Sequence, residues 1–249
     1  QAKILLDATY SITTGTGNLS ATIAAGTHES GDITLANIST TGTVTLNTSS
    51  TSANSTNSTL NATVDNGTTA LILGTSNVGG DLTLTSGATA GITDNGIVTV
   101  VGNLIATTDA GNGLINMGTL AVEGTIALTT NGTGEGAGDA TVVNADGLKF
   151  AASTIGDDLT ATATDGDVTQ EGALTIVGET TITATGNDVT LDLATNNFDS
   201  DHLSVGLLTV TGKDVNIQDS DYLKLAPTIS GNLTVLAGND IDDGGLSDV

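Results

Sequence analysis

Residues 166–193 have the sequence GDVTQEGALTIVGETTITATGNDVTLDL, and this stretch decides the fold. Apolar residues alternate with polar ones over runs of four or five positions, and Gly, Asn and Asp separate the runs. Alternation with a period of two predicts short strands with one apolar and one polar face. The Gly, Asn and Asp residues between the runs predict tight turns. Because no segment shows the 3.6-residue period of a helix, we expect an all-β structure.

A short period recurs along the chain. An Asp followed by Val or Ile opens a predicted strand at Asp167, Asp188, Asp214 and Asp240. A sandwich or barrel has no reason to repeat in this way and needs aromatic bulk, whereas this chain has two Phe, two Tyr and no Trp. Coils stacked along one axis do repeat, and each coil covers the strand edges of the next. We therefore predict a parallel β-solenoid with three short strands per coil of about 21–26 residues.

A longer repeat is also visible. Similar segments start at Leu71, Leu148 and Leu223, and at this spacing we expect three coils per long repeat. The predicted organisation is a single β-helix segment of a longer array over residues 1–249, with a polar loop near 49–59 and the clearest repeats at 71–145, 146–220 and 221–249, the last of them partial.

Charge and composition exclude several classes of function. The net charge is −24, from 28 acidic and four basic side chains, and there is no arginine. Nucleic acids and anionic membrane surfaces bind clusters of cations, so we expect neither as a partner. Hydrophobic residues make up 37% of the chain, which is too many for an acidic disordered segment. No apolar run approaches the ~18 residues of a membrane span, so we expect no membrane insertion.

The sequence of the repeats resembles that of a known family. The stretches that carry the resemblance are Val78-Gly-Gly-Asp-Leu-Thr-Leu-Thr85, Gly172 to Thr185, Gly186 to Phe198, Gly212-Lys-Asp-Val-Asn-Ile217 and Ile229-Ser-Gly-Asn-Leu-Thr-Val235. They are similar to repeats of filamentous-haemagglutinin-type exoproteins, the large adhesins exported by two-partner secretion, most clearly over residues 71–245. The resemblance implies a right-handed parallel β-helix, export through a dedicated outer-membrane pore, and a shaft role in adhesion.

The resulting functional expectation is a secreted adhesin or filament shaft at the cell surface, which holds a binding region away from the cell. The expected partners are the outer-membrane secretion pore, a host or matrix glycan or protein receptor, and further copies of the chain in filaments. No catalytic residue and no cofactor is assigned.

Acidic pairs provide an alternative. They occur at Asp157/Asp158, Asp165/Asp167, Asp199/Asp201, Asp219/Asp221 and Asp240/Asp242/Asp243. Calcium binds several carboxylate and carbonyl oxygens, and stacked turns would bring such groups together, as in a calcium-stabilised surface-layer or matrix scaffold. The simpler interpretation, which we favour, is that Asp after Gly caps a turn through its side chain and keeps the rod soluble. The metal ligands, if calcium binds, are not assigned.

Two further alternatives are weaker. Paired carboxylates suit a polysaccharide-active β-helix enzyme, but the chain lacks Trp and Arg, and His28 and His202 have no evident partner, so we expect no enzyme. Thr-x-Thr runs such as Thr181/Thr183/Thr185 suggest ice binding. Because the coils differ in length, we expect the threonine runs of successive coils not to align with one another.

Overall fold

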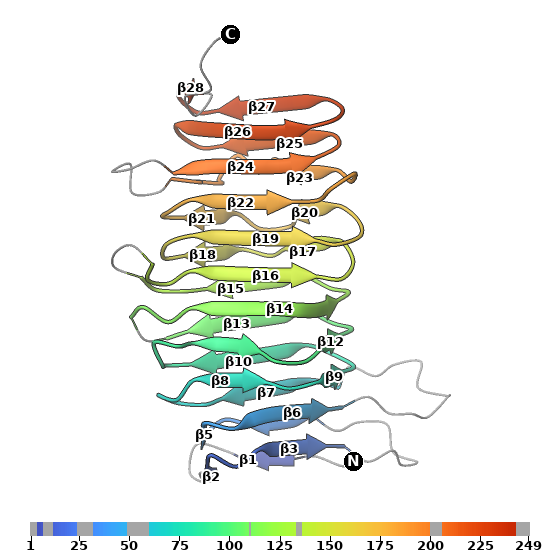
Figure 1. Ribbon diagram of the computed structural model, residues 1–249, viewed down its shortest axis with the longest axis vertical. Coiled ribbons are helices and arrows are strands. Elements are labelled where there is room, and N and C mark those ends of the chain that lie inside the picture. Colours follow the sequence, from blue (N-terminus) through green and yellow to red (C-terminus); the bar gives the residue numbers. More distant parts are fainter. Residues whose placement is uncertain are drawn as a thin grey trace.

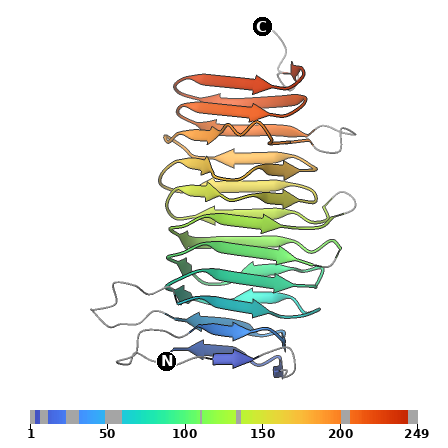
Figure 2. The same ribbon diagram turned by 180° about the vertical axis from the view of Figure 1, so that it is seen from behind.

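The chain winds into a single stack of coils. The computed structural model describes residues 4–6, 12–23, 32–48, 60–109, 111–132, 136–199 and 206–242, so the predicted polar loop at 49–59 lies outside the described residues. Strands on the near side of the stack run to the right and strands on the far side run to the left as the chain climbs from the N-terminus (Figures 1 and 2). This sense of winding is right-handed, and the predicted right-handed parallel β-helix is confirmed.

Two large sheets form opposite sides of the stack, and all their pairings are parallel. Sheet 1 contains β1 (Ile4–Leu6), β4 (Ile33–Leu35), β7 (Ala62–Asp65), β10 (Leu82–Ser86), β13 (Leu104–Thr108), β15 (Ile126–Thr129), β17 (Leu148–Phe150), β18 (Ser153–Ile155), β20 (Val168–Gln170), β21 (Leu174–Ile176), β23 (Val189–Leu191), β25 (Val215–Asp219) and β27 (Leu233–Ala237).

Sheet 2 contains β3 (Leu19–Thr22), β6 (Thr43–Asn47), β8 (Leu71–Leu73), β9 (Ser76–Val78), β11 (Ile92–Asp94), β12 (Val98–Val100), β14 (Ile115–Val122), β16 (Ala140–Asn144), β19 (Leu159–Ala163), β22 (Thr180–Thr183), β24 (Leu207–Gly212), β26 (Leu223–Ile229) and β28 (Ile241–Asp242). A small third sheet pairs β2 (Ile12–Gly15) with β5 (Ile38–Thr40). A coil therefore has two or three strands and passes through one large sheet and then the other. The described residues contain no helix that could cross a membrane.

Register along sheet 1 shows where each coil begins. Val168 pairs with Val189 and Val189 with Val215, so the predicted coil starts at Asp167, Asp188 and Asp214 are confirmed. The next partner in sheet 1 is Leu233, which closes a shorter coil. Ile241, which was predicted to continue this series, instead pairs with Leu223 in sheet 2. That prediction is wrong because an Asp followed by Val or Ile can begin a strand in either sheet.

The long repeat does not contain a whole number of coils. Leu71 lies in sheet 2, where Ile92, Ile115 and Ala140 follow it at one-coil steps. Leu148, the predicted equivalent of Leu71, comes soon after Ala140 and lies in sheet 1. The predicted three coils per repeat is thus wrong by half a coil, and successive copies of the repeat occupy opposite sheets.

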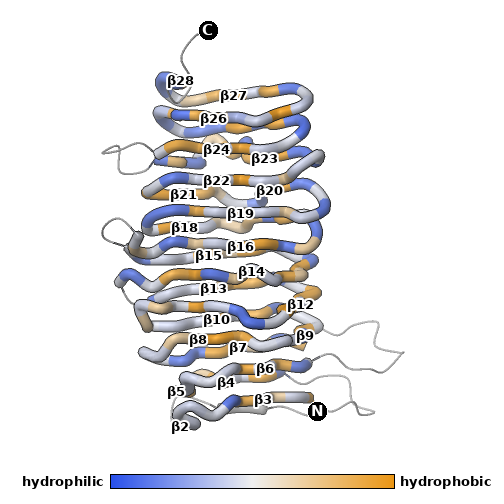
Figure 3. The backbone as a smooth tube through the Cα atoms, in the orientation of Figure 1, coloured by the Kyte–Doolittle hydropathy of each residue, from blue (hydrophilic) through white to orange (hydrophobic). Residues whose placement is uncertain are grey.

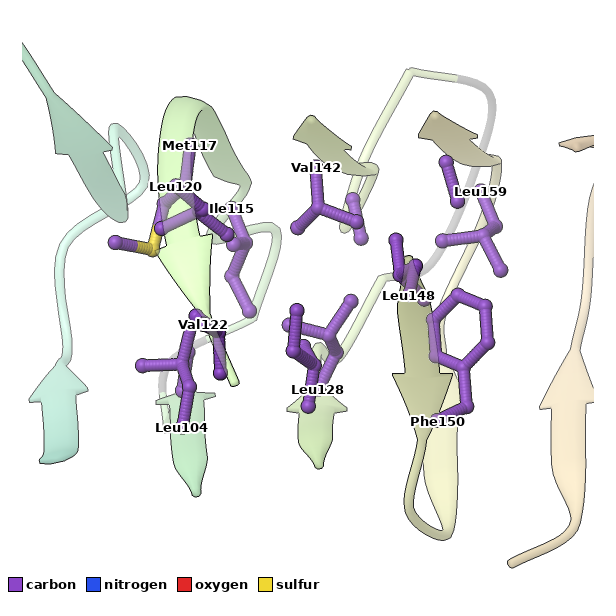
Figure 4. Close-up of a cluster of buried hydrophobic side chains, with 14 of the residues drawn as sticks. Leu104, Ile115, Met117, Leu120, Val122, Leu128, Val142, Leu148, Phe150 and Leu159 are labelled. Atoms are coloured by element: carbon purple, nitrogen blue, oxygen red, sulfur yellow. The ribbon is translucent and has the colours of Figure 1, made fainter. Parts of the chain in front are cut away.

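The core is a narrow aliphatic layer between the two sheets. Along most strands, buried and partly exposed residues alternate. In β10, Leu82, Leu84 and Ser86 are buried and the threonines between them are partly exposed. Apolar colour alternates with polar colour along the strands in Figure 3. Side chains from both sheets point toward one another in Figure 4, where Phe150 lies beside Leu148 and Leu159. Phe150 and Phe198 are fully buried and are the bulkiest of the core side chains.

Candidate functional site: the polar corners of the solenoid

One row of polar side chains runs along the corner where sheet 1 begins. Asp32, Asn61, Asp81, Asn103 and Thr125 each stand immediately before a strand of sheet 1. The Oδ1 atom of each of the first four accepts a hydrogen bond from the backbone N–H of the next member, at 3.0, 2.8, 2.7 and 2.8 Å. We call this row, with its continuation below, the Asx ladder. It joins each coil to the coil above it.

The ladder stops at Thr125 and resumes near the C-terminal end of sheet 1. The N–H groups of Asp188, Asp214 and Asn232 donate to the Oδ1 atoms of Asp167, Asp188 and Asp214, at 2.9, 3.2 and 2.7 Å. The Asn232 N–H, with Lys213 next to it, holds the pKa of the Asp214 carboxyl below its ordinary value. Asp was predicted to cap a turn through its side chain, and these side chains do so for the turn of the next coil.

Glycine precedes Asp81, Asn103 and Thr125 of the ladder because the coils touch there. Gly80, Gly102 and Gly124 stack on one another, and Gly102 N–H donates to the Gly80 carbonyl at 3.0 Å. A Cβ on Gly102 would lie 2.4 Å from Asp81 Oδ1 and 2.6 Å from the Gly80 carbonyl carbon. Close approach between coils, and not an unusual φ, therefore requires glycine at this position.

Replacing Gly102 with alanine is expected to lower the free energy of unfolding by about 1–3 kcal/mol, because the new methyl group pushes two coils apart. Gly118 gives a matched control, since a Cβ there meets no atom within 4 Å. The Gly118→Ala variant should change the midpoint of urea unfolding little. Equal losses in the two variants would show that the coils do not touch closely at this corner.

Three carboxylates meet at the corresponding corner of sheet 2. Oxygens of Asp139, Asp157 and Asp158 all lie within 4.8 Å of one another. Asp158 N–H donates to Asp139 Oδ1 at 3.4 Å, Glu179 N–H to Asp158 Oδ1 at 2.7 Å, and Ala137 N–H to Asp157 Oδ2 at 3.1 Å. Sequence reasoning paired Asp157 with Asp158 but missed Asp139, which lies one coil below. Asp139 and Asp158 thus each accept a backbone N–H of the next coil, as in the Asx ladder, whereas Asp157 accepts one from the coil below.

Burial, and then the nearby charges of Asp157 and Asp158, raise the pKa of the Asp139 carboxyl above its ordinary value of 3.8. A carboxyl whose pKa is higher in the folded chain than in the unfolded chain holds its proton better when folded. Its contribution to stability is therefore greatest below its unfolded pKa and is lost as the pH rises through the folded pKa.

Replacing Asp139 with asparagine is accordingly expected to stabilise the protein at pH 7, by under about 1 kcal/mol because the group is half-exposed. The amide keeps the oxygen that accepts the Asp158 N–H. The gain should vanish below about pH 3, where the wild-type carboxyl is largely protonated in both states. Urea unfolding at both pH values measures it, with Asp165→Asn as the control for the change in net charge. A gain that persists at low pH would contradict the assignment.

The remaining acidic pairs do not gather into a site among the described residues. Asp219 is buried and accepts the N–H groups of Phe198 and Asp221, at 2.8 and 2.7 Å. Asp242 accepts the Tyr222 hydroxyl at 2.8 Å, and Asp199 is buried. Four candidate residues, Asp201, Asp243, His28 and His202, lie outside the described residues.

Sequence reasoning missed three buried asparagines. Asn66, Asn144 and Asn196 are almost fully buried, and each hydrogen-bonds backbone groups of its own coil and of a neighbouring coil. Asn144, for example, accepts from Val122 N–H at 2.8 Å and donates to the carbonyls of Val122 and Gly147, at 3.0 and 2.7 Å. In the sequence such residues look like ordinary turn asparagines, and only their burial distinguishes them.

A groove of about 370 Å³ lies where the Asx ladder is interrupted. Its charged lining residues are Glu123, Asp146, Lys149 and Asp167, and no aromatic or histidine side chain contributes to it. Lys149 pairs with Glu171 at 3.2 Å, and both side chains are largely exposed. Exposed pairs of this kind contribute little to stability, so they act chiefly to offset the acidic surface.

Comparison with known proteins places the chain in a family of repeats. A family model described as repeats of unknown function (DUF5649) matches residues 59–117 and 137–203. Together the two matches cover just over half of the 249 residues. The chain belongs to the DUF5649 family. No curated protein and no solved structure matches it significantly.

The two DUF5649 matches begin on opposite sides of the solenoid. The first described strand in the first match is β7, in sheet 1, and the first in the second match is β16, in sheet 2. Ala62 of β7 and Ala140 of β16 stand at the same distance from the start of their respective matches. The first described strands of the two matches thus lie in opposite sheets, and the matched segments form part of one β-solenoid scaffold.

Proposed function

We propose that this DUF5649 solenoid is the shaft of a secreted adhesin or filament at the cell surface. The observation that carries the proposal is that the conspicuous polar residues of the corners are engaged in joining coil to coil. Asp81, for instance, accepts the N–H of Asn103 at 2.7 Å while its own N–H donates to Asn61 at 2.8 Å. A chain built in this way forms a long and stiff stack, and a spacer needs both properties.

The proposal includes the expected route and partners. The resemblance of the repeats to filamentous-haemagglutinin-type exoproteins supports export through an outer-membrane pore and placement at the cell surface. The receptor would be a glycan or protein of a host or matrix, and shafts could associate into filaments. The acidic surface, with a net charge of −24, supports a partner other than nucleic acid or anionic membrane.

A spacer should extend the reach of a binding module without binding that module's ligand itself. The test places the full chain between a surface anchor and a binding module of known ligand, and compares it with a Gly/Ser linker of equal length, which behaves as a flexible coil. We expect the solenoid to increase capture of ligand-coated particles across a polymer brush, and the solenoid without the module to capture none. Capture equal to that of the flexible linker would contradict the shaft, and so would capture of the ligand-coated particles by the solenoid without the module.

The two alternative functions give different results in simple assays. A calcium-stabilised scaffold requires a lower melting temperature in EDTA, whereas the shaft requires no change. A polysaccharide-active enzyme would release new reducing ends from a panel of polysaccharides. We propose that no such activity exists, because the groove at Glu123, Asp146 and Asp167 lacks the aromatic surface on which sugar rings stack.

A further inference from the structure

Six threonines form a regular array on the outer face of sheet 2. In β19, β22 and β24, Thr160, Thr181 and Thr209 pair in one file, and Thr162, Thr183 and Thr211 pair in a second. We call these six residues the threonine array. The files continue to Thr141 and Thr228 on the adjacent strands, with Val143 and Ala226 at the two remaining positions.

The expectation that unequal coils put Thr-x-Thr runs out of file is wrong here. The coil from Thr181 to Thr209 is longer than the coil from Thr160 to Thr181, yet the register is unbroken. The additional residues lie between β22 and β24, in the connection that includes β23, and leave the strands of sheet 2 aligned. Across β19, β22 and β24, coil length therefore varies in the connections while the face stays regular.

Each array position is held rigidly. The residues between the threonine pairs, Ala161, Ile182 and Val210, are fully buried in the core and fix the outward direction of their neighbours. Threonine is β-branched, so its χ1 angle is restricted. None of the six hydroxyls hydrogen-bonds to another residue in the described ranges. The array thus presents a methyl and a free hydroxyl at every point.

The array is also neutral on a strongly acidic protein. The strand segments LTATA, TTIT and LLTVTG contain no charged and no aromatic residue. A charged partner would find no complementary group on them, and a sugar would find no ring to stack on. What the array offers is a regular lattice whose points are about 4.8 Å apart between strands and roughly 6.7 Å apart along a strand.

We propose that the threonine array binds ice. Among ligands available in water, an ice surface is itself a rigid lattice with hydrogen-bonding groups at fixed repeats of a few ångströms, so it can engage many equivalent weak contacts at once. The backbone pairing between coils fixes the array before binding, so little conformational entropy is lost when it binds. This activity is independent of the shaft role and adds to it.

The test measures partition of the full chain into a slowly growing ice front. We expect the wild type to be enriched in ice and the Thr181→Lys/Thr183→Lys variant to be excluded to the level of a non-binding protein. Thr190→Lys, on the outer face of β23 in sheet 1, is the matched control and should behave as the wild type. Melting curves confirm that all three proteins are folded.

Two results would overturn the proposal. One is exclusion of the wild type from ice. Exclusion together with dimers formed through the array would show that the array binds a second copy of the chain and not ice. The other is an equal loss in the array variant and in Thr190→Lys, which would assign the effect to charge and not to the lattice.

Discussion

Replacing Phe150 with alanine is expected to lower the free energy of unfolding by about 3–5 kcal/mol, the largest effect of any single substitution considered. Phe150 is fully buried in β17, and the solenoid core is otherwise filled by aliphatic side chains and one further phenylalanine. Removing the ring loses its transfer free energy and leaves a cavity between the two sheets. Backbone hydrogen bonds hold each sheet to the coils above and below, so the site can collapse only in part.

Urea unfolding measures this loss, and Ile105→Ala is the matched control. Ile105 lies on β13 of the same sheet but is 42% exposed, so its replacement should cost under about 1 kcal/mol. Because stacked coils can unfold in stages, the transition is followed by two probes to establish whether it is two-state. A loss in Phe150→Ala no larger than in Ile105→Ala would contradict the proposed core.

Replacing Asn196 with alanine should cost about 3 kcal/mol or more, because several buried groups lose their partner at once. Asn196 Oδ1 accepts from Leu174 N–H at 3.0 Å and from Gln170 Nε2 at 2.8 Å. Its Nδ2 donates to Gln170 Oε1 at 2.8 Å and to the carbonyls of Leu191 and Gln218, both at 3.1 Å. One amide thus joins three successive coils.

The control for this substitution is Asn216→Ala. Asn216 donates to Asp192 at 3.0 Å in an exposed contact, and its loss should change stability by no more than about 0.5 kcal/mol. If both variants unfolded at the same urea concentration, the buried amide would have no special role.

The fold was largely predictable because its signals are local. Alternation along Leu174-Thr-Ile176 fixes a strand with one buried face, and the Asp-Val wording at Asp167 and Asp188 fixes where coils begin. A parallel stack then follows, because the backbone N–H and C=O groups at the edges of such short strands find their partners on the similar strand of the next coil.

The choice of sheet was not predictable. Leu71 and Leu148 open similar strands on opposite sheets, since both sheets need the same apolar face and the same turn. The partners of the polar groups were equally hidden. Asp139 meets Asp157 and Asp158 only once the coils are stacked, and the threonine files depend on where the longer connections place their additional residues.

The central claim is that the acidic corners are hydrogen-bonding links between coils, and Asp81 tests it most directly. Asp81 Oδ1 accepts the Asn103 N–H, a task that an amide oxygen performs equally well, as Asn61 and Asn103 show at neighbouring steps. The measurement is the urea midpoint of Asp81→Asn and Asp81→Ala in the full chain. We predict that Asp81→Asn is as stable as the wild type and that Asp81→Ala is less stable by about 1–2 kcal/mol. An asparagine variant as unstable as the alanine variant would show that the negative charge is what the corner requires, and would contradict the account.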